Sequence, residues 1–420
     1  QVDLRHLELG SVFGFFGKIL DSRRIALLTV TEYDSREQAE LEATRLAIAQ
    51  DVETEVLPVL QSRARGTIVL TNGEATISAP DVLWLQPGSP GGSITVHDVE
   101  YGKGFPWHGR QDRRYRGIIY LTIDRNGRLT VANLISAEHL LRGLVPAEIY
   151  PSAPKAALKA QAITARGELL AKIGLRHLAD PYLVCGDVHC QVYAGLQRED
   201  NRTDRAVFET RGEMLFSEGN LVDAVYCANC GGHTESSENV WNSDPSSVLQ
   251  GRPDGRRTLK SLSESAVRAW VSSNPSSYCN KIGYKTTSFR WTKMVAVETI
   301  RNGLQALGKD PGEILGISVT RRGISGRATK VIIQGNSKLV TVSGELAIRQ
   351  CFGSLKSSMF VLDTVAGRNG RVKAFKFLGG GFGHGVGMCQ DGAIGMARRD
   401  RSYQQILSHY YKNAGVERIY

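Results

Sequence analysis

The sequence predicts an α+β protein: a β-rich body that carries one long helix, preceded by a small α+β segment. Three observations support this class. Apolar β-prone runs recur between residues 66 and 135, a helical apolar stripe spans 153–173, and a strand-then-helix pattern lies within 24–60. The 420 residues are 41% hydrophobic and 22% charged, which excludes a disordered or disulfide-stapled chain and predicts two or three domains.

Residues 1–65 are expected to form the small α+β module. Residues 25–31 are an apolar β-prone run, and a helix capped by Asp34 or Ser35 follows. The second apolar run, 56–60, contains a proline and therefore suits only an edge strand. The pattern resembles half of a SPOR-type glycan-binding repeat.

Residues 66–114 are a β-rich lead-in to a main domain at 115–415. Strand signals alternate with turn dipeptides at Asn72-Gly73 and Asn126-Gly127. The long helix at 153–173, with Ser152 as its N-cap, ends before Gly174. Segment 243–290, rich in Ser, Arg, Asn and Pro, is expected to be an exposed excursion.

The charge balance predicts an anionic partner. The chain has 52 basic and 42 acidic residues, a net charge of +10, which suits nucleic acid, an acidic membrane surface or an acidic polysaccharide. No apolar run reaches the ~20 residues of a membrane span. A phosphate-binding loop, an H-E-x-x-H metal motif and a G-x-S-x-G nucleophile elbow are all absent from the sequence, and no organic cofactor is expected.

Glu148 is the candidate general acid. It lies between Pro146 and Pro151 among apolar residues, a setting that removes water and raises the pKa of a carboxyl group. The alternative is that Glu148 only decorates the start of the following helix, where a negative charge is favourable.

Four residues after the long helix are candidate zinc ligands: His177, Cys185, His189 and Cys190. Two thiolates and two imidazoles form a closed tetrahedral shell, as in structural zinc sites. A disulfide between Cys185 and Cys190 is the alternative.

A second cysteine pair, Cys227 and Cys230, is followed by Gly231-Gly232. Two glycines allow the backbone to approach a ligand closely. The pair also suits a redox dithiol, or a metal site completed by His233, although no thioredoxin-like context surrounds it.

Glycine is concentrated near the C-terminus, at 379–392. The segment lacks G-x-G-x-x-G, which argues against a dinucleotide site. Alternating glycines at 381–387 predict a bare backbone floor for an extended polymer, with His384 on the opposite face. Close packing that needs glycine for steric reasons is the alternative.

These motifs, in this order, resemble the SpoIID/LytB family of sporulation and cell-wall proteins over residues 115–415. The matching stretches are Leu141-Arg-Gly-Leu-Val-Pro-Ala-Glu148, Ala157 to Arg166, Gly231 to Trp241 and Gly381 to Gln390. The resemblance implies a lytic transglycosylase that acts on peptidoglycan glycan strands free of stem peptides. Glu148 stands at the family's catalytic acid position, and the resemblance also implies a zinc site of two Cys and two His.

Further expectations follow from the resemblance. The candidate substrate-binding residues are Arg166, Tyr226, Gly231, Gly232, Thr234, Gly383, His384, Gly385 and Gln390. The chain departs from the family pattern at Cys227 and Asp391, which leaves the inner substrate contacts open. The location is expected to be extracytoplasmic and nucleic acid is not expected as a partner.

Two other functions remain as alternatives. One is a non-catalytic glycan-binding protein that activates a cell-wall amidase. The other is a glycoside hydrolase that uses water and takes Asp391 or Glu238 as its second carboxylate.

Overall fold

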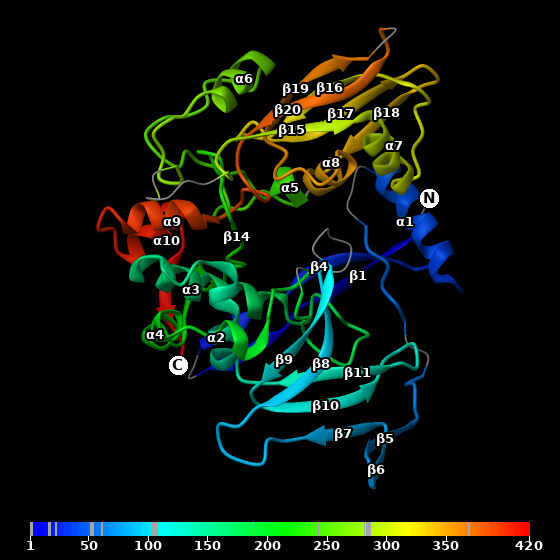
Figure 1. The fold of residues 1–420 in the computed structure, drawn as a ribbon, viewed down its shortest axis with the longest axis vertical. Helices are drawn as coiled ribbons and strands as arrows, with labels where there is room; N and C mark the ends of the chain where they lie inside the picture. Colours follow the sequence, from blue (N-terminus) through cyan, green and yellow to red (C-terminus); the bar gives the residue numbers. More distant parts are fainter. Residues whose placement is uncertain are drawn as a thin grey trace. The chain divides into compact units, whose positions relative to one another are not determined.

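The computed structural model describes residues 3–15, 18–21, 23–50, 54–59, 62–102, 108–187, 189–241, 243–280, 282, 287–367 and 370–420 (Figure 1). The chain divides into two compact units. Unit 1 comprises residues 1–223 and 416–420, and unit 2 comprises residues 224–415. The division falls inside the 115–415 segment that the sequence analysis treats as one domain. Among the described residues, no helix is both long and apolar enough to cross a membrane.

Unit 1 combines small antiparallel sheets with a helical core. Its strands are β1 (Leu4–Leu9), β2 (Val12–Phe15), β3 (Lys18–Asp21), β4 (Arg24–Thr29), β5 (Thr67–Asn72), β6 (Ala75–Pro80), β7 (Val82–Leu85), β8 (Ile94–Tyr101), β9 (Gly109–Tyr115), β10 (Ile118–Ile123), β11 (Leu129–Leu134), β12 (Glu213–Ser217), β13 (Asn220–Leu221) and, returning from unit 2, β22 (Gly415–Arg418). Its helices are α1 (Arg36–Gln50), α2 (Ala137–Glu148), α3 (Lys155–Lys172), the 3-10 turn η1 (Gly195–Arg198) and α4 (Asn201–Glu209).

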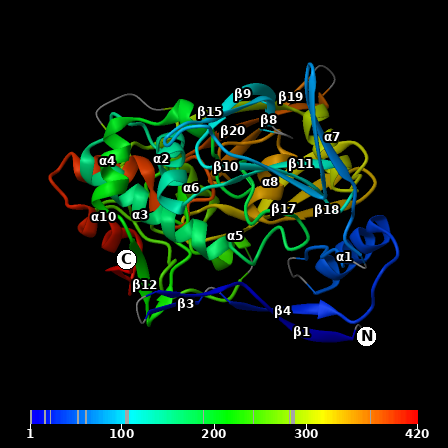
Figure 2. The same cartoon turned by 90° about the horizontal axis from the view of Figure 1, so that it is seen from below.

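The sheets of unit 1 follow the turn signals in the sequence. β5 pairs with β6 across Asn72-Gly73, and β10 pairs with β11 across Asn126-Gly127. β10 also pairs with β7, and β8 pairs with β9. β1 and β4, dark blue in Figure 2, form an antiparallel ribbon.

Helix α3 is the centre of unit 1. Most of its side chains are buried, and it packs against α2, α4 and β12. The small residues Ala157, Ala160 and Ala165 are completely buried, which lets these elements approach α3 closely. The predicted long helix is therefore confirmed, and it begins after Pro154 rather than at a Ser152 cap.

Unit 2 contains two antiparallel three-stranded sheets, ordered β15-β20-β19 and β16-β17-β18. Its strands are β14 (Tyr226–Cys227), β15 (Trp291–Ala296), β16 (Ile314–Arg322), β17 (Ala328–Gly335), β18 (Leu339–Ser343), β19 (Phe360–Ala366), β20 (Val372–Gly379) and β21 (Met388–Cys389). Its helices are α5 (Glu238–Trp241), α6 (Glu264–Ser272), α7 (Val297–Ala306), α8 (Glu345–Cys351), α9 (Gln390–Ala397) and α10 (Tyr403–Tyr410).

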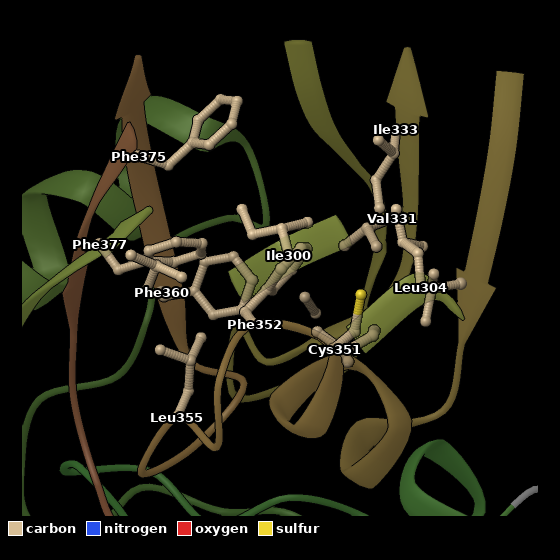
Figure 3. Close-up of a cluster of buried hydrophobic side chains, with 14 of the residues drawn as sticks. Ile300, Leu304, Val331, Ile333, Cys351, Phe352, Leu355, Phe360, Phe375 and Phe377 are labelled. Carbon is tan, nitrogen blue, oxygen red and sulfur yellow. The ribbon is translucent and has the colours of Figure 1, made fainter. Parts of the chain in front are cut away.

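The main core of unit 2 lies between these strands and helices α7 and α8 (Figure 3). Three rings, those of Phe352, Phe360 and Phe377, contact one another with centroid separations of 5.1–6.0 Å. Ile300 on α7 and Val331 on β17 belong to the same core and are fully buried. The tight packing gives unit 2 a rigid scaffold for its loops.

The α+β class is confirmed, and two local predictions are wrong. Residues 54–59 form no strand, because β4 takes β1 as its partner and Pro58 lacks a backbone N–H; Leu60 lies outside the described residues. Segment 243–290 is not a wholly exposed excursion. It contains α6, whose Val267 and Trp270 are buried against Met359.

Candidate functional site

Glu148 is the last residue of α2, and the backbone is extended at Ile149. Leu141, Leu144 and Val145 on the same helix are completely buried, so Glu148 stands at the end of a firmly packed element. The negative end of a helix dipole disfavours a charged carboxylate. Glu148 therefore does not decorate the start of a helix. Glu148 is partly exposed, and its role as a general acid stays a prediction.

Arg166 lies in the core of unit 1, and its side chain is 0% exposed. Its Nε and Nη2 donate to the two carboxylate oxygens of Glu138 at 2.8 and 2.9 Å, and Nη1 donates to the Glu213 carbonyl at 3.0 Å. Arg166 is thus held by internal acceptors. The expectation that it positions a sugar is corrected: it joins α2 and α3 to β12.

The four predicted zinc ligands converge, and their donor atoms all lie within 4.8 Å of one another. His177 Nε2 lies 3.2 Å from His189 Nδ1 and 3.3 Å from Cys190 Sγ. His189 Nδ1 lies 3.5 Å from Cys190 Sγ and 3.8 Å from Cys185 Sγ. For ligands about 2.0–2.3 Å from a central zinc ion, the edges of a tetrahedron measure roughly 3.3–3.8 Å. These separations fit that shell.

The surroundings orient the ligands of this cluster. His177 Nδ1 lies 2.8 Å from Asp180 Oδ2, which places the proton on Nδ1 and leaves the Nε2 lone pair for a metal. The buried Lys172 ammonium donates to the Cys190 carbonyl at 2.7 Å and to Glu168 at 2.5 Å. The loop is thereby fixed to α3.

The thiols of this cluster have different electrostatic environments. The hydrogen bond from Cys190 lowers the pKa of the Cys185 thiol to about 4, with further hydrogen bonds from His189 and His177. The same hydrogen bond and burial raise the pKa of Cys190. All seven cysteines of the chain are free thiols in the structure, so it does not contain the alternative Cys185–Cys190 disulfide.

His384 lies in unit 2, partly exposed, in the glycine-rich segment. Its Nδ1 accepts the Val386 N–H at 3.0 Å, which leaves the proton of the neutral ring on Nε2. The Trp241 ring packs on the imidazole with a centroid separation of 5.0 Å. Tyr226 is partly exposed and Gln390 is buried at the start of α9.

The glycines at 381–387 do not form an extended floor. Gly381, Gly383, Gly385 and Gly387 all have left-handed φ angles of 71–93°. A Cβ on Gly385 would lie 2.2 Å from Arg327 Cζ, and one on Gly387 would lie 1.9 Å from the Val225 carbonyl oxygen. Steric need therefore explains glycine at these two positions. Gly383 is partly exposed.

Gly231, Gly232 and Thr234 are buried within unit 2. The two glycines have φ angles of 72° and 97°, so only glycine adopts them readily. Thr234 Oγ1 accepts the Arg252 N–H at 2.9 Å. These residues shape the loop from inside and do not present side chains to a ligand.

Sequence reasoning missed a second cluster: Cys230, Cys279 and Cys389 converge with Asp254. Their donor atoms lie within 4.8 Å of one another, and all four residues are 0% exposed. Burial raises the pKa of the three thiols and of the Asp254 carboxyl. The four residues are scattered over 160 positions of the chain, so no local spacing could have indicated them.

The cluster replaces the site expected from Cys227 and Cys230. His233 is not among its members; its Nδ1 donates to the Thr234 carbonyl at 2.8 Å. Burial lowers the pKa of His233.

A basic pocket of about 610 Å³ lies beside the second cluster in unit 2. The Arg399 guanidinium lies 4.9 Å from the centroid of the Tyr278 ring in its wall. The lining residues are Gly255, Arg256, Arg257, Ser276, Ser277, Tyr278, Arg399 and Arg401. Four arginines and an aromatic face suit an anionic ligand with a ring.

Comparisons with known proteins agree with the sequence motifs. Residues 125–216 match the family described as Stage II sporulation protein (SpoIID), and residues 235–387 match a domain of unknown function, DUF8618. The SpoIID match includes Glu148 and the His177–Cys190 cluster. The resemblance to the SpoIID/LytB family is thus confirmed.

Three relatives illustrate the similarity. An uncharacterized protein of Brachyspira hyodysenteriae is 27% identical over 77% of this chain and 79% of its own length. The amidase enhancer of Bacillus subtilis is 27% identical over 64% of this chain but only 39% of its own length. Stage II sporulation protein D of Bacillus subtilis is 25% identical over 71% of this chain and 79% of its own length.

Proposed function

We propose, from the SpoIID-family segment at residues 125–216, that the protein is a peptidoglycan lytic transglycosylase. Its substrate is a glycan strand free of stem peptides, and it cleaves the MurNAc–GlcNAc bond. Its site of action is extracytoplasmic, where peptidoglycan lies. The observation that carries the proposal is Glu148 at the C-terminal end of α2, inside that segment.

One carboxyl group suffices for this reaction. Protonated Glu148 donates its proton to the glycosidic oxygen as the bond to the anomeric carbon breaks. The resulting carboxylate then removes the proton of the same sugar's 6-hydroxyl, whose oxygen attacks the anomeric carbon. The product is a 1,6-anhydro end, and Glu148 returns to its protonated form. The attack is intramolecular, so no bound water is needed.

Residues of unit 2 are proposed to hold the glycan. His384 lies partly exposed in the glycine-rich segment, and the neighbouring Trp241 offers an aromatic face for a sugar ring. Tyr226 and Gly383 belong to the same sequence motifs and are partly exposed. Gln390 is the first residue of α9.

The first cluster is proposed to hold a structural zinc ion. His177, Cys185, His189 and Cys190 supply two nitrogens and two sulfurs whose donor atoms converge within 4.8 Å, the donor set of a structural zinc site. The ion would fix the loop that follows α3, and no catalytic step passes through it.

Product analysis tests the function. Purified stripped glycan is incubated with the parent and with Glu148→Gln, and the ends are identified by mass spectrometry. Anhydro ends should fall at least about 100-fold in the variant, because the proton donor is lost. Glu218→Gln, an exposed glutamate of the same unit, should keep parental activity. Reducing ends would indicate hydrolysis, and no cleavage by the parent would refute the enzyme.

An amidase activator is the second candidate, supported by the similarity to the amidase enhancer. In that case the protein grips glycan and stimulates a cell-wall amidase without cutting the strand. Glu148→Gln would then stimulate a purified amidase as well as the parent does, and neither protein would release anhydro ends.

Hydrolysis by a second carboxylate has less support. Asp391 is buried and accepts the Asn229 amide at 2.8 Å. Glu238 is the first residue of α5, and its Oε2 is buried.

A further inference from the structure

We propose that Cys230, Cys279, Cys389 and Asp254 bind a zinc ion in unit 2, separate from the His–Cys cluster of unit 1. Three sulfurs and one carboxylate oxygen are a recognised kind of donor set for a thiophilic divalent cation. The inference depends on the geometry of these four residues and not on the proposed enzymatic function.

The separations match a single ion. Cys230 Sγ lies 3.7 Å from Cys279 Sγ, and two sulfurs bound to one zinc at about 2.3 Å lie roughly 3.8 Å apart in a tetrahedron. A disulfide requires about 2.05 Å. The fourfold convergence within 4.8 Å also leaves room for one ion rather than for a multi-iron cluster.

The protein supplies the hydrogen bonds that metal-bound thiolates need. The backbone N–H groups of Cys230 and Gly392 donate to Cys389 Sγ at 3.2 and 3.3 Å. Cys389 is also the N-cap of α9, where the helix dipole favours a negative sulfur. Such donors stabilise charge on sulfur that a buried neutral thiol would not require.

The carboxylate is oriented in the same way. Asp254 Oδ2 accepts the Cys279 N–H at 2.7 Å, and Oδ1 accepts the Tyr410 hydroxyl at 2.5 Å. The partly buried Arg290 guanidinium interacts electrostatically with Cys230 and Cys279. These groups offset the excess negative charge of three thiolates and one carboxylate around a divalent ion.

The ion would join three distant segments. Cys230 follows β14, Asp254 and Cys279 flank the irregular segment around α6, and Cys389 ends β21. Gly255 and Tyr278, next to two of the ligands, line the arginine pocket. The site would therefore hold the shape of that pocket and the start of α9.

Metal analysis of the full chain tests the proposal. Zinc is measured by inductively coupled plasma mass spectrometry in the parent, Cys279→Ser and His189→Ala, each purified without chelator. We expect His189→Ala to keep the ion of unit 2 and Cys279→Ser to lose it. After cobalt loading, the sulfur-to-cobalt charge-transfer absorbance of Cys279→Ser should fall about 2.5-fold, from five thiolates to two.

Cys351→Ser is the matched control, because Cys351 is also buried but is the last residue of α8, in the main core of unit 2 and not in the cluster. It should bind as much zinc as the parent. A folded His189→Ala without zinc overturns the proposal, and so does Cys279→Ser with the parent's zinc content. A Cys230–Cys279 disulfide in the parent, seen as a 2 Da deficit under non-reducing conditions, overturns it as well.

Discussion

Arg166 illustrates how a motif position differs from a surface position. The residue belongs to a stretch shared with the SpoIID family, and the sequence analysis assigns it to the substrate. In the structure its guanidinium forms a two-pronged ion pair with Glu138, and it is fully buried. The residue types and their order along the chain identify the motif. The burial of Arg166, however, depends on contacts with β12 and α4, which lie 40 or more residues further along the chain.

The pair gives a pH-dependent prediction. Burial raises the pKa of Glu138, but hydrogen bonds from Arg166 and Tyr420 and the Arg166 charge lower it more, so the pKa lies below its usual 4.5. A lowered carboxyl pKa stabilises the fold above pH 4.5, and this stability is lost as the pH falls through the folded-state pKa. Glu138→Gln should cost about 3 kcal/mol at pH 7, because Arg166 stays buried without its partner.

Urea denaturation followed by circular dichroism between pH 7 and pH 3 measures this effect. The free energy of unfolding should fall less steeply with acid in Glu138→Gln than in the parent. Glu37→Gln, an exposed glutamate on α1, should leave the parental slope unchanged. Parallel slopes for the parent and Glu138→Gln would contradict the assignment.

At the scale of elements, local patterns predicted well and distant pairing did not. Helix α3 and the turns at Asn72-Gly73 and Asn126-Gly127 follow from residues adjacent in sequence. Helix α2 was missed, because Gly143 and Pro146 are poor helix residues. Gly143 is needed for packing, since a Cβ there would lie 2.7 Å from the Gly195 carbonyl oxygen.

The two candidate metal-binding clusters show the same contrast. The first uses ligands within 14 consecutive residues, and its members were all identified from the sequence. The second joins Cys230 to Cys389 through the parallel pairing of β14 with β21, which no local pattern predicts.

The glycine-rich loop gives a prediction at this scale. Gly387→Ala places a Cβ 1.9 Å from the Val225 carbonyl oxygen, at a φ of 71°. Strain at that φ costs roughly 1–2 kcal/mol, and the backbone clash should bring the total loss above about 3 kcal/mol. Thermal denaturation measures the loss.

Gly308→Ala is its control in the same unit. Gly308 has a φ of 66° with no atom within 4 Å of the added Cβ, so only the conformational cost of roughly 1–2 kcal/mol is expected. Equal losses of stability in Gly387→Ala and Gly308→Ala would mean that the glycine-rich loop rearranges to relieve the clash.

For the whole molecule, the α+β class followed from the mixture of periodicities, and the division into two units did not. The boundary at residues 223 and 224 has no linker composition to mark it. The boundary depends on which strands pack into the same core, and those strands come from all parts of the sequence.

Net charge gives the prediction at this scale. The surplus of ten positive charges should attract the lactyl carboxylates of stripped glycan. Raising NaCl from 0.05 to 0.5 M should weaken glycan binding by about tenfold, because the screening length falls to a few ångströms. Co-sedimentation or calorimetry measures the affinity. Glycan with amidated carboxyls should show little salt dependence, and an equal dependence for both glycans would exclude the charge effect.

The return of the chain to unit 1 has a consequence for biosynthesis. Strand β22 (Gly415–Arg418) completes the β13-β12-β22 sheet, and the Tyr420 hydroxyl donates to Glu138 at 2.7 Å. Unit 2 is therefore nested within unit 1 in the order of translation. The ribosome must synthesise almost 200 intervening residues before β22 can pair with β12. Unit 2 therefore has time to fold first, while one edge of β12 is still unpaired.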